Sequence, residues 1–246
     1  VVEEVRKFHK THYYANNITA CVISPLKIEE INWLDFIFNY LEKKYDEFYN
    51  KKVVVKRVGQ TLDTLLKKNR SFRGYQKSTI VSQETLKKIV SVNPLIPSAR
   101  NQQVLRFKTV TKDTGAELVL GNIKLGGALP ELHLPFEGTE PEAFIIICST
   151  LPESKYVDID LGISAQSMLL KAVELGLNGI AIGAFDKEKI TAAFNLPYEP
   201  LLILAIGKGN EDIRLTSIRE TDKHQYYREN GVHYVPKIQV DDLLIP

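Results

Sequence analysis

The sequence has little of what marks several large classes of protein. Its only two cysteines, Cys21 and Cys148, both lie in apolar contexts, so there is neither a disulfide framework nor a Cys-x-x-Cys zinc knuckle. No apolar run approaches the roughly 20 residues that span a bilayer. The formal net charge of +2 gives no broad basic surface. These shortages argue against a disulfide-rich, membrane-spanning or general nucleic-acid-binding protein.

Two phosphate-binding motifs are also missing. The Gly- and Pro-rich region 121–139 contains neither a Gly-Lys-Ser/Thr phosphate loop nor a Gly-x-Gly-x-x-Gly turn, which argues against a P-loop enzyme or a Rossmann cofactor site. What is present is ordinary for a globular protein: 246 residues, 44% hydrophobic and 25% charged. This length fits one sizeable domain with a smaller additional piece.

The stretch from Asp158 to Phe185 is the most informative part of the chain. Its pattern predicts a helix over 161–175, with Asp160 as N-cap and Gly176 just past the end. The polar positions of this helix form one narrow stripe: Ser164, Ser167, Lys171 and Glu174. Because the rest of its surface is apolar, neighbours must bury it on several sides. A short buried strand is expected over 179–185. A core helix and strand is the simpler interpretation, and a backbone platform for a flat ligand is the alternative.

Other elements follow from local signals. The pattern predicts a helix over 59–69 and a second one capped by Ser82, a short helix capped by Asp186, and a hairpin turn at Asn230-Gly231. A continuous apolar run predicts a mid-sheet strand at 143–149, and further strands are expected at 104–110 and 200–207.

Two segments carry candidate binding chemistry. Asn69-Arg-Ser-Phe-Arg-Gly-Tyr75 follows a helix, and its two arginines could converge on one phosphate because guanidinium groups are permanently charged, fixed donors. Arginines at a helix end more often face water. Ile96-Pro-Ser-Ala-Arg-Asn-Gln-Gln-Val-Leu-Arg-Phe107 offers small residues and amides to a planar ring, and a capped turn before a strand is the simpler alternative.

Several ordered motifs together resemble the FMN-dependent nitroreductase family from about residue 58 to the C-terminus. They are Arg70-Ser71-x-Arg73, Pro97-Ser98-Ala99-x-Asn101-x-Gln103-x-x-x-Phe107, Asp160-x-Gly162-x-x-x-Gln166, Gly176-Leu177, Gly183, and the tail Tyr226–Pro236. The resemblance implies an α+β fold, with a mixed sheet flanked by helices. It also implies a cytoplasmic homodimer with a swapped C-terminal arm, FMN at the dimer interface, and NAD(P)H as electron donor to a small-molecule acceptor.

The resemblance further implies a division of labour among the site residues. Those that hold the phosphate and ribityl chain are Arg70, Ser71, Arg73 and Arg214, with Lys208 as a helper. Those that meet the flavin ring on one side are Pro97, Ser98, Ala99, Asn101 and Gln103. Gly183 and Ala184 lie on the other side, where a backbone N–H reaches flavin N5, and Leu129 to Phe136 lines the acceptor pocket. The chemistry belongs to FMN, with no catalytic side chain and no metal.

The chain departs from the commonest family pattern at two positions. Gly183 stands where many members have an acidic residue, and this leaves the donor preference and the two- or four-electron outcome open. Asn69 stands where many have arginine, and this removes one phosphate contact.

The N-terminal part differs in texture, so residues 1–56 are predicted to be a small α/β extension and residues 57–246 the FMN-binding domain. Phe8 to Thr19, followed by a strand and a helix, resembles a fragment of pitrilysin/insulinase-type metallopeptidases. The segment lacks the His-x-x-Glu-His zinc helix of those enzymes, since Lys-Thr separates His9 and His12. A zinc peptidase is therefore the weakest reading. A dimeric scaffold of the same fold that has lost its cofactor is the main alternative to the flavoenzyme.

Overall fold

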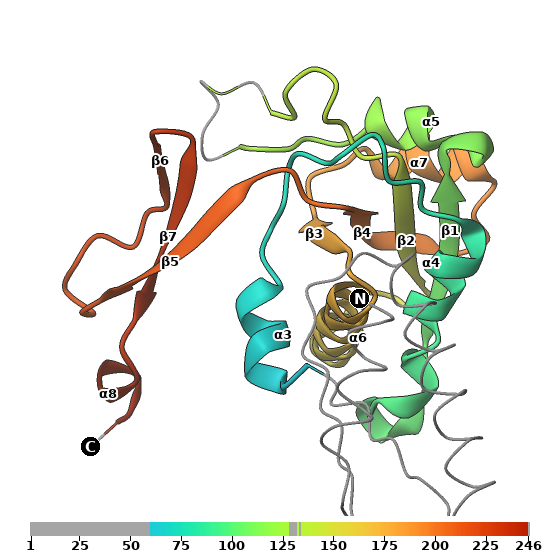
Figure 1. Cartoon of the computed structure of the whole chain (residues 1–246). Coiled ribbons are helices and arrows are strands. Elements are labelled where there is room, and N and C mark those ends of the chain that lie inside the picture. The colour runs from blue at the N-terminus through green and yellow to red at the C-terminus, as the bar shows by residue number, and fades with distance from the viewer. Residues whose placement is uncertain (1–59, 128–131, 133, 246) are drawn as a thin grey trace, which may run out of the picture. The chain divides into compact units, whose positions relative to one another are not determined.

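The computed structural model describes residues 60–127, 132 and 134–245. The chain divides into two compact units, 1–60 and 61–246, and every element described below belongs to the second (Figure 1). The predicted N-terminal extension, with its metallopeptidase-like segment, lies outside the described residues. Among the described residues, no helix combines the length and the apolar character that crossing a membrane requires.

An antiparallel sheet forms the body of this unit, in the order β1-β2-β4-β3. The strands are β1 (Leu105–Thr111), β2 (Ala143–Ser149), β3 (Asn178–Ile182) and β4 (Glu199–Gly207). All seven residues of β2 are buried, and this explains why its sequence is an uninterrupted apolar run. The prediction of a mid-sheet strand at this position is confirmed.

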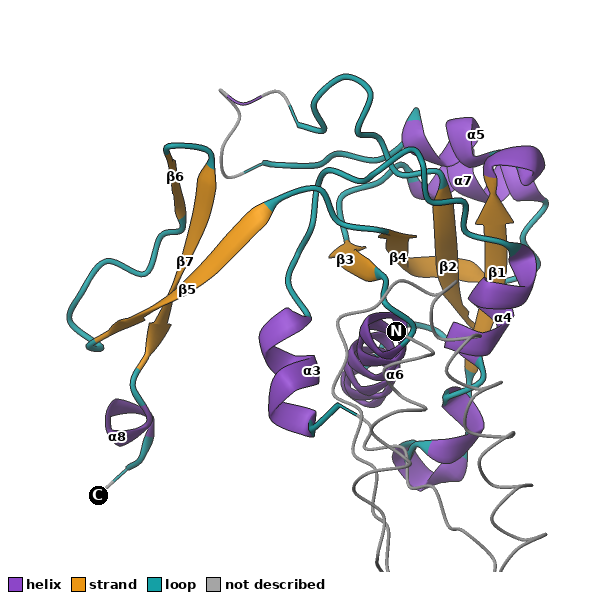
Figure 2. Ribbon diagram, viewed as in Figure 1, coloured by secondary structure: helices purple, strands orange, loops and turns teal. Residues whose placement is uncertain are grey.

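Helices cover both faces of the sheet (Figure 2). The helices α4 (Gln83–Val90) and α6 (Lys155–Glu174) pack on one face, and α5 (Ala116–Leu120) and α7 (Lys187–Phe194) on the other. Alternate residues of β2 enter the two cores, since side chains along a strand point to opposite faces. The α+β class, with sheets flanked by helices, is confirmed. Ser82 and Asp186 cap α4 and α7 as predicted, each accepting a backbone N–H.

The helix α6 begins about two turns earlier than predicted. Its N-cap is Ser154, whose hydroxyl accepts the N–H of Val157 at 3.4 Å. Asp160 was the predicted cap, but its carboxylate is buried within the helix and accepts the N–H of Ala99, a long-range partner that no local pattern reveals. The predicted end of the helix is right, because Gly176 follows it with a φ of +77°.

Shorter elements connect these layers. α3 (Leu62–Lys68) lies beside α6 and is capped by Thr61, and the one-turn helices η1 (Asn93–Leu95) and η2 (Ala99–Asn101) precede β1. The one-turn helix η3 (Lys112–Thr114) follows β1. No residue of α3 is buried within the described unit.

The C-terminal arm, defined here as residues 212–243, forms a second, mixed sheet beside the body (Figures 1 and 2). β5 (Asp212–Ile218) pairs parallel with β7 (Val232–Ile238), and β6 (Tyr227–Glu229) pairs antiparallel with β7. The short helix α8 (Val240–Leu243) ends it. Asn230 and Gly231 both have positive φ, 49° and 79°, as the predicted hairpin turn requires.

Candidate functional site

The segment 69–75, here called the arginine segment, runs along the edge strand β3. Ser71 forms a parallel bridge with Gly179, whose carbonyl oxygen accepts the N–H of Phe72 at 3.2 Å. A Cβ at position 179 would lie 2.6 Å from Leu169 and 2.7 Å from the carbonyl oxygen of Ala205. Glycine at this position therefore lets β3 pack closely against α6 and β4.

Two aromatic side chains fasten the arginine segment to the end of β4. Phe72 and Tyr75 are buried, and they fill the space that side chains at Gly209 and Gly207 would need. The Tyr75 hydroxyl donates to the carbonyl oxygen of Phe72 at 2.9 Å. Burial in this apolar place raises the pKa of Tyr75 above its ordinary value, with the charge of Glu211 adding to the effect. The phenol is thus a neutral anchor that fixes the backbone between the arginines.

Arg70 has one buried donor without a partner in the described part of the chain. Its Nη2 donates to the carbonyl oxygen of Leu66 at 2.8 Å, while its Nε is buried and makes no hydrogen bond there. Partial burial lowers the pKa of its guanidinium. Since buried donors in folded proteins nearly always have partners, an anion at Arg70 would satisfy a group that is otherwise left over.

Arg73 and Lys208 are two further basic residues of the predicted phosphate site. The guanidinium of Arg73 donates to the carbonyl oxygen of Ser71 at 3.0 Å and lies 5.3 Å from the ring centroid of Tyr226 in the C-terminal arm. Lys208 directly follows β4, and its ammonium donates to the carbonyl oxygen of Gly176 at 3.2 Å. Its own carbonyl oxygen accepts the N–H of Gln76, the residue directly after the arginine segment, at 2.8 Å. Arg70, Ser71 and Arg73 therefore lie on one segment beside the edge strand β3, and Lys208 lies where the chain leaves the neighbouring strand β4.

The residues predicted to meet a ring form a tight turn around η2. Arg100, Asn101 and Gln103 all have positive φ, at 52°, 54° and 50°. Three left-handed residues within four positions are unusual for side chains with a Cβ, and such strain gathers at binding sites. The turn is held by the Ser98 hydroxyl, which accepts the N–H of Gln103 at 3.2 Å, and by the side-chain bond between Gln103 and Asn101 at 3.1 Å.

The helix α6 supports both candidate regions. Asp160 accepts the N–H of Ala99 at 2.8 Å in the turn, and Gln166 accepts the amide of Asn69 at 3.2 Å in the arginine segment. Six residues separate the two positions, which places them about 9 Å apart along the helix and about 120° apart around it. The two regions therefore attach to different sides of α6 in one chain.

Gly183 and Ala184 follow the far end of β3. Four residues separate Gly179 from Gly183, about 13 Å of extended strand. Both residues are exposed, and a Cβ at Gly183 would meet nothing within 4 Å. The carbonyl oxygen of Ala184 accepts the N–H of Lys124 at 2.8 Å, so the region that leads into the predicted acceptor insert lies beside it.

Arg214 lies in β5 of the arm, away from the other predicted phosphate residues in sequence and in sheet. Its guanidinium is exposed and makes two hydrogen bonds to Asp212, at 2.6 and 3.2 Å. Asp212 raises the pKa of Arg214. Within the described residues of one chain, no hydrogen bond or ion pair joins Arg214 to the arginine segment.

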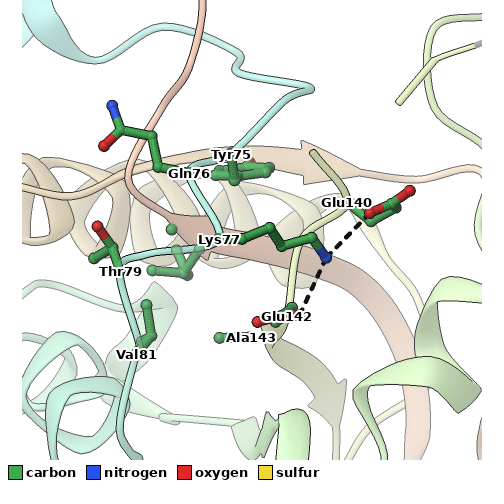
Figure 3. A pocket seen from close by; sticks show the side chains of 10 residues that line it. Tyr75, Gln76, Lys77, Thr79, Val81, Glu140, Glu142 and Ala143 are labelled. Carbon is green, nitrogen blue, oxygen red and sulfur yellow. Dashed lines mark hydrogen bonds and ion pairs between the residues drawn. The ribbon is translucent and has the colours of Figure 1, made fainter. Parts of the chain in front are cut away.

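A small pocket opens beside Tyr75 and Gly207 (Figure 3). Lys77 crosses its mouth and pairs with Glu140 at 3.0 Å and Glu142 at 3.1 Å. Its volume of 20 Å³ holds one water molecule and is far too small for an aromatic cofactor. None of the predicted flavin contacts lines this pocket.

Sequence reasoning missed one carboxylate. Glu211, 6% exposed at its side chain, accepts the N–H groups of Arg73 and Gly74 and pairs with Arg228 of β6. Nothing in the local sequence distinguishes it from a surface acid, because its partners lie far away along the chain.

Among the described residues, no group of three His, Cys, Asp or Glu side chains could hold a metal ion. Cys148 is buried in the sheet, and burial raises its pKa to about 11.

The sequence model of the nitroreductase family matches residues 66–208, more than half of the chain. The chain belongs to the nitroreductase family. The matched range contains the arginine segment, the η2 turn, α6, β3 and Lys208, and it ends before the arm. This match confirms the family that the sequence motifs predicted.

Three relatives illustrate the similarity, each at low sequence identity. The Bacillus subtilis (strain 168) protein YdgI, named as an NAD(P)H nitroreductase, is 23% identical over 184 residues, which cover 60% of this chain and 88% of YdgI. Among solved structures, a nitroreductase family protein from Streptococcus pneumoniae TIGR4 is 17% identical. The match covers 63% of this chain and 93% of that one, with a TM-score of 0.51.

Another solved relative contains FMN. A protein from Exiguobacterium sibiricum 255-15, solved in complex with FMN, is 20% identical, with 63% of this chain and 91% of that one covered and a TM-score of 0.50. At this identity the likeness concerns the fold. Three features of this chain fit FMN. The buried Nε of Arg70, which has no partner among the described residues, fits a phosphate. The strained turn around η2 and the open space at Gly183 fit a flat ring.

Proposed function

We propose that this nitroreductase-family chain is an FMN-dependent NAD(P)H oxidoreductase that reduces nitroaromatic, quinone or related small acceptors in a ping-pong cycle. The observation that carries the proposal is Arg70, whose buried Nε has no partner among the described residues, on a segment fastened to the sheet by Phe72 and Tyr75. Bound FMN would supply the redox chemistry, accepting a hydride from NAD(P)H and passing electrons to the second substrate.

The chain's own groups would bind and orient. In this proposal Arg70, Ser71 and Arg73 hold the phosphate and ribityl chain through charge-assisted hydrogen bonds. In the same proposal Lys208, just after β4, adds positive charge, and Arg214 comes from the arm. On the ring side the proposed contacts are Pro97, Ser98, Ala99, Asn101 and Gln103. Gly183 and Ala184 offer backbone N–H groups, and the missing side chain at Gly183 leaves room for a ring to approach.

We further propose that the working unit is a homodimer whose arms reach across to the partner. The arginine segment and the η2 turn attach to different sides of α6, so one chain does not enclose a single ligand between them. A second copy would supply the other half of the crevice.

Flavin retention tests the proposal directly. The purified chain is incubated with FMN and freed of excess ligand, and its visible spectrum is recorded. A retained flavin band, bleached by NADH or NADPH and restored by a quinone, is the expected result. A protein that stays colourless would sink the flavoenzyme and favour the alternative, a dimeric scaffold that has lost its cofactor.

The domain boundary is a separate proposal, with residues 1–56 as an extension and 57–246 as the flavin-binding domain. Deletion of residues 1–52 is expected to leave flavin affinity and the dimer intact, because every proposed contact lies beyond residue 69. Analytical ultracentrifugation and flavin titration of the shortened protein check this. Loss of either property would show that the extension is integral to the fold.

A further inference from the structure

The C-terminal arm meets the body through one buried carboxylate. Glu211 lies at the base of β5, and one of its oxygens accepts the N–H groups of Arg73 and Gly74, the latter at 2.9 Å. Its other oxygen pairs with Nη2 of Arg228. With both oxygens bonded and its side chain only 6% exposed, Glu211 ties the arginine segment to β6 of the arm.

Arg228 has a second neighbour besides Glu211. Its guanidinium carbon lies 5.4 Å from the ring centroid of Phe136, within the range of a cation–π contact. The side chain of Arg228 is 15% exposed and stands opposite His233 in the hairpin, so the arm holds it in place. Arginine suits this position because its planar group can pair with a carboxylate at one edge and lie over a ring with its face.

Phe136 ends the insert that is expected to border the acceptor. Its carbonyl oxygen accepts both the N–H and the hydroxyl of Thr139, at 2.9 and 2.7 Å. The carbonyl oxygen of Thr139 in turn accepts the N–H of Tyr75 at 2.8 Å. The backbone of Phe136 is therefore fixed relative to the arginine segment, whereas 43% of the residue remains exposed.

We propose that Arg228, held by Glu211, is a positioning residue that orients the ring of Phe136 as a stacking platform for aromatic acceptors. The inference rests on the proposed function, because it assigns Phe136 to the acceptor side of the flavin crevice. One face of the ring meets the cation, and the exposed remainder is available to a flat substrate such as a quinone or a nitroarene. Arg228 acts through Phe136 and does not touch the flavin.

The test compares Arg228→Lys with Phe136→Leu and the double variant. Lysine keeps the charge that pairs with Glu211 but lacks the planar face of the guanidinium. The fold is therefore expected to be preserved, while the Phe136 ring loses the contact that orients it. The KM for a quinone is expected to rise about 3- to 10-fold in each variant and no further in the double variant, as for one shared cation–π contact. FMN affinity, reduction by NAD(P)H and the KM for ferricyanide, which does not stack, are expected to stay unchanged.

A second readout needs no flavin. Amide hydrogen exchange of the peptide that contains residues 134–139 is expected to quicken in Arg228→Lys and to match the wild type in Glu199→Gln. The control breaks the ion pair between Lys187 and Glu199 at another edge of the body. It leaves Arg228 and its partners untouched.

Three results would overturn the inference while the flavoenzyme stands: an unchanged quinone KM in Arg228→Lys, additive effects in the double variant, or an equal rise in the KM for ferricyanide. Unchanged exchange at 134–139 would overturn it without reference to activity. A wild-type chain that binds no FMN would instead sink the proposed function itself.

Discussion

The body and the C-terminal arm of this molecule are stabilised by different interactions. All seven residues of β2 are buried in the body, whereas no residue of β5 is buried in the arm and only His233 is buried in β7. Charged contacts hold the arm instead, such as Arg228 with Glu211, and Arg219 with Asp242 at 2.7 Å. Loss of apolar burial should therefore unfold the body, while changes of charge or pH should loosen the arm and leave the body folded.

The largest expected difference comes from deleting apolar volume. Ile146→Ala empties a fully buried position of β2 and should lower the free energy of unfolding by about 2–5 kcal/mol. Leu215→Ala in β5, where the side chain is 42% exposed, should change it by about 0.5 kcal/mol or less. Urea unfolding of the two variants checks this. Equal losses would mean that the arm has an apolar core of its own.

Two arginines extend the comparison to the cofactor. Arg70→Ala in the body should weaken FMN binding by about 1.5–3 kcal/mol, as for a charge-assisted hydrogen bond. Arg214→Ala in the arm should weaken it less, because Arg214 already has Asp212 as a partner. Fluorescence titration with FMN measures both affinities. Unchanged affinity in Arg70→Ala would show that the phosphate site is misplaced.

Two glycines should respond with opposite signs. Gly231→Ala places a Cβ at a φ of +79° in the arm hairpin and should destabilise it by about 1 kcal/mol. Gly162→Ala in the exposed face of α6 meets no atom within 4 Å and should stabilise the body by about 0.5–1 kcal/mol, since alanine favours the helix. Thermal unfolding, with hydrogen exchange to locate the effect, compares them. A destabilising Gly162→Ala would indicate a close neighbour from a second copy.

The smallest expected effect is a dependence on pH confined to the arm. Burial lowers the pKa of His233, the charges of Arg73 and Arg228 lower it further, and Glu211 opposes them. The unfolded arm therefore binds the proton more readily, and hairpin stability should be complete above the ordinary histidine pKa of about 6.5 and fall as the pH drops below it. Protection factors of the arm amides between pH 8 and 5 measure this. His233→Gln should abolish the slope, and the body should show none.

Local signals were enough to predict much of the body. The apolar run of β2, the caps Ser82 and Asp186, and the Asn230-Gly231 turn all act within a few residues, so the sequence alone predicts them. The predicted start of α6 was wrong because the Asp160 carboxylate accepts the distant N–H of Ala99 and does not cap its own helix.

Long-range contacts explain what the sequence did not reveal about the candidate site. Gly179, Gly207 and Gly209 matter because another segment packs against them. Glu211 and Arg228 are ordinary charges until the fold brings them together. The role of each predicted flavin contact stays a prediction, although Arg70, Ser71 and Arg73 lie on one segment beside the edge strand β3.

The aromatic anchors of the arginine segment have a practical consequence. The rings of Phe72 and Tyr75 pack directly against the backbone of Gly209 and Gly207, so even an alanine at either glycine would displace the whole segment. A protein engineer who wished to retune this crevice for another anion could exchange the guanidinium groups one by one. The two aromatic residues and the two glycines would have to be kept, because they determine the position of any replacement charge.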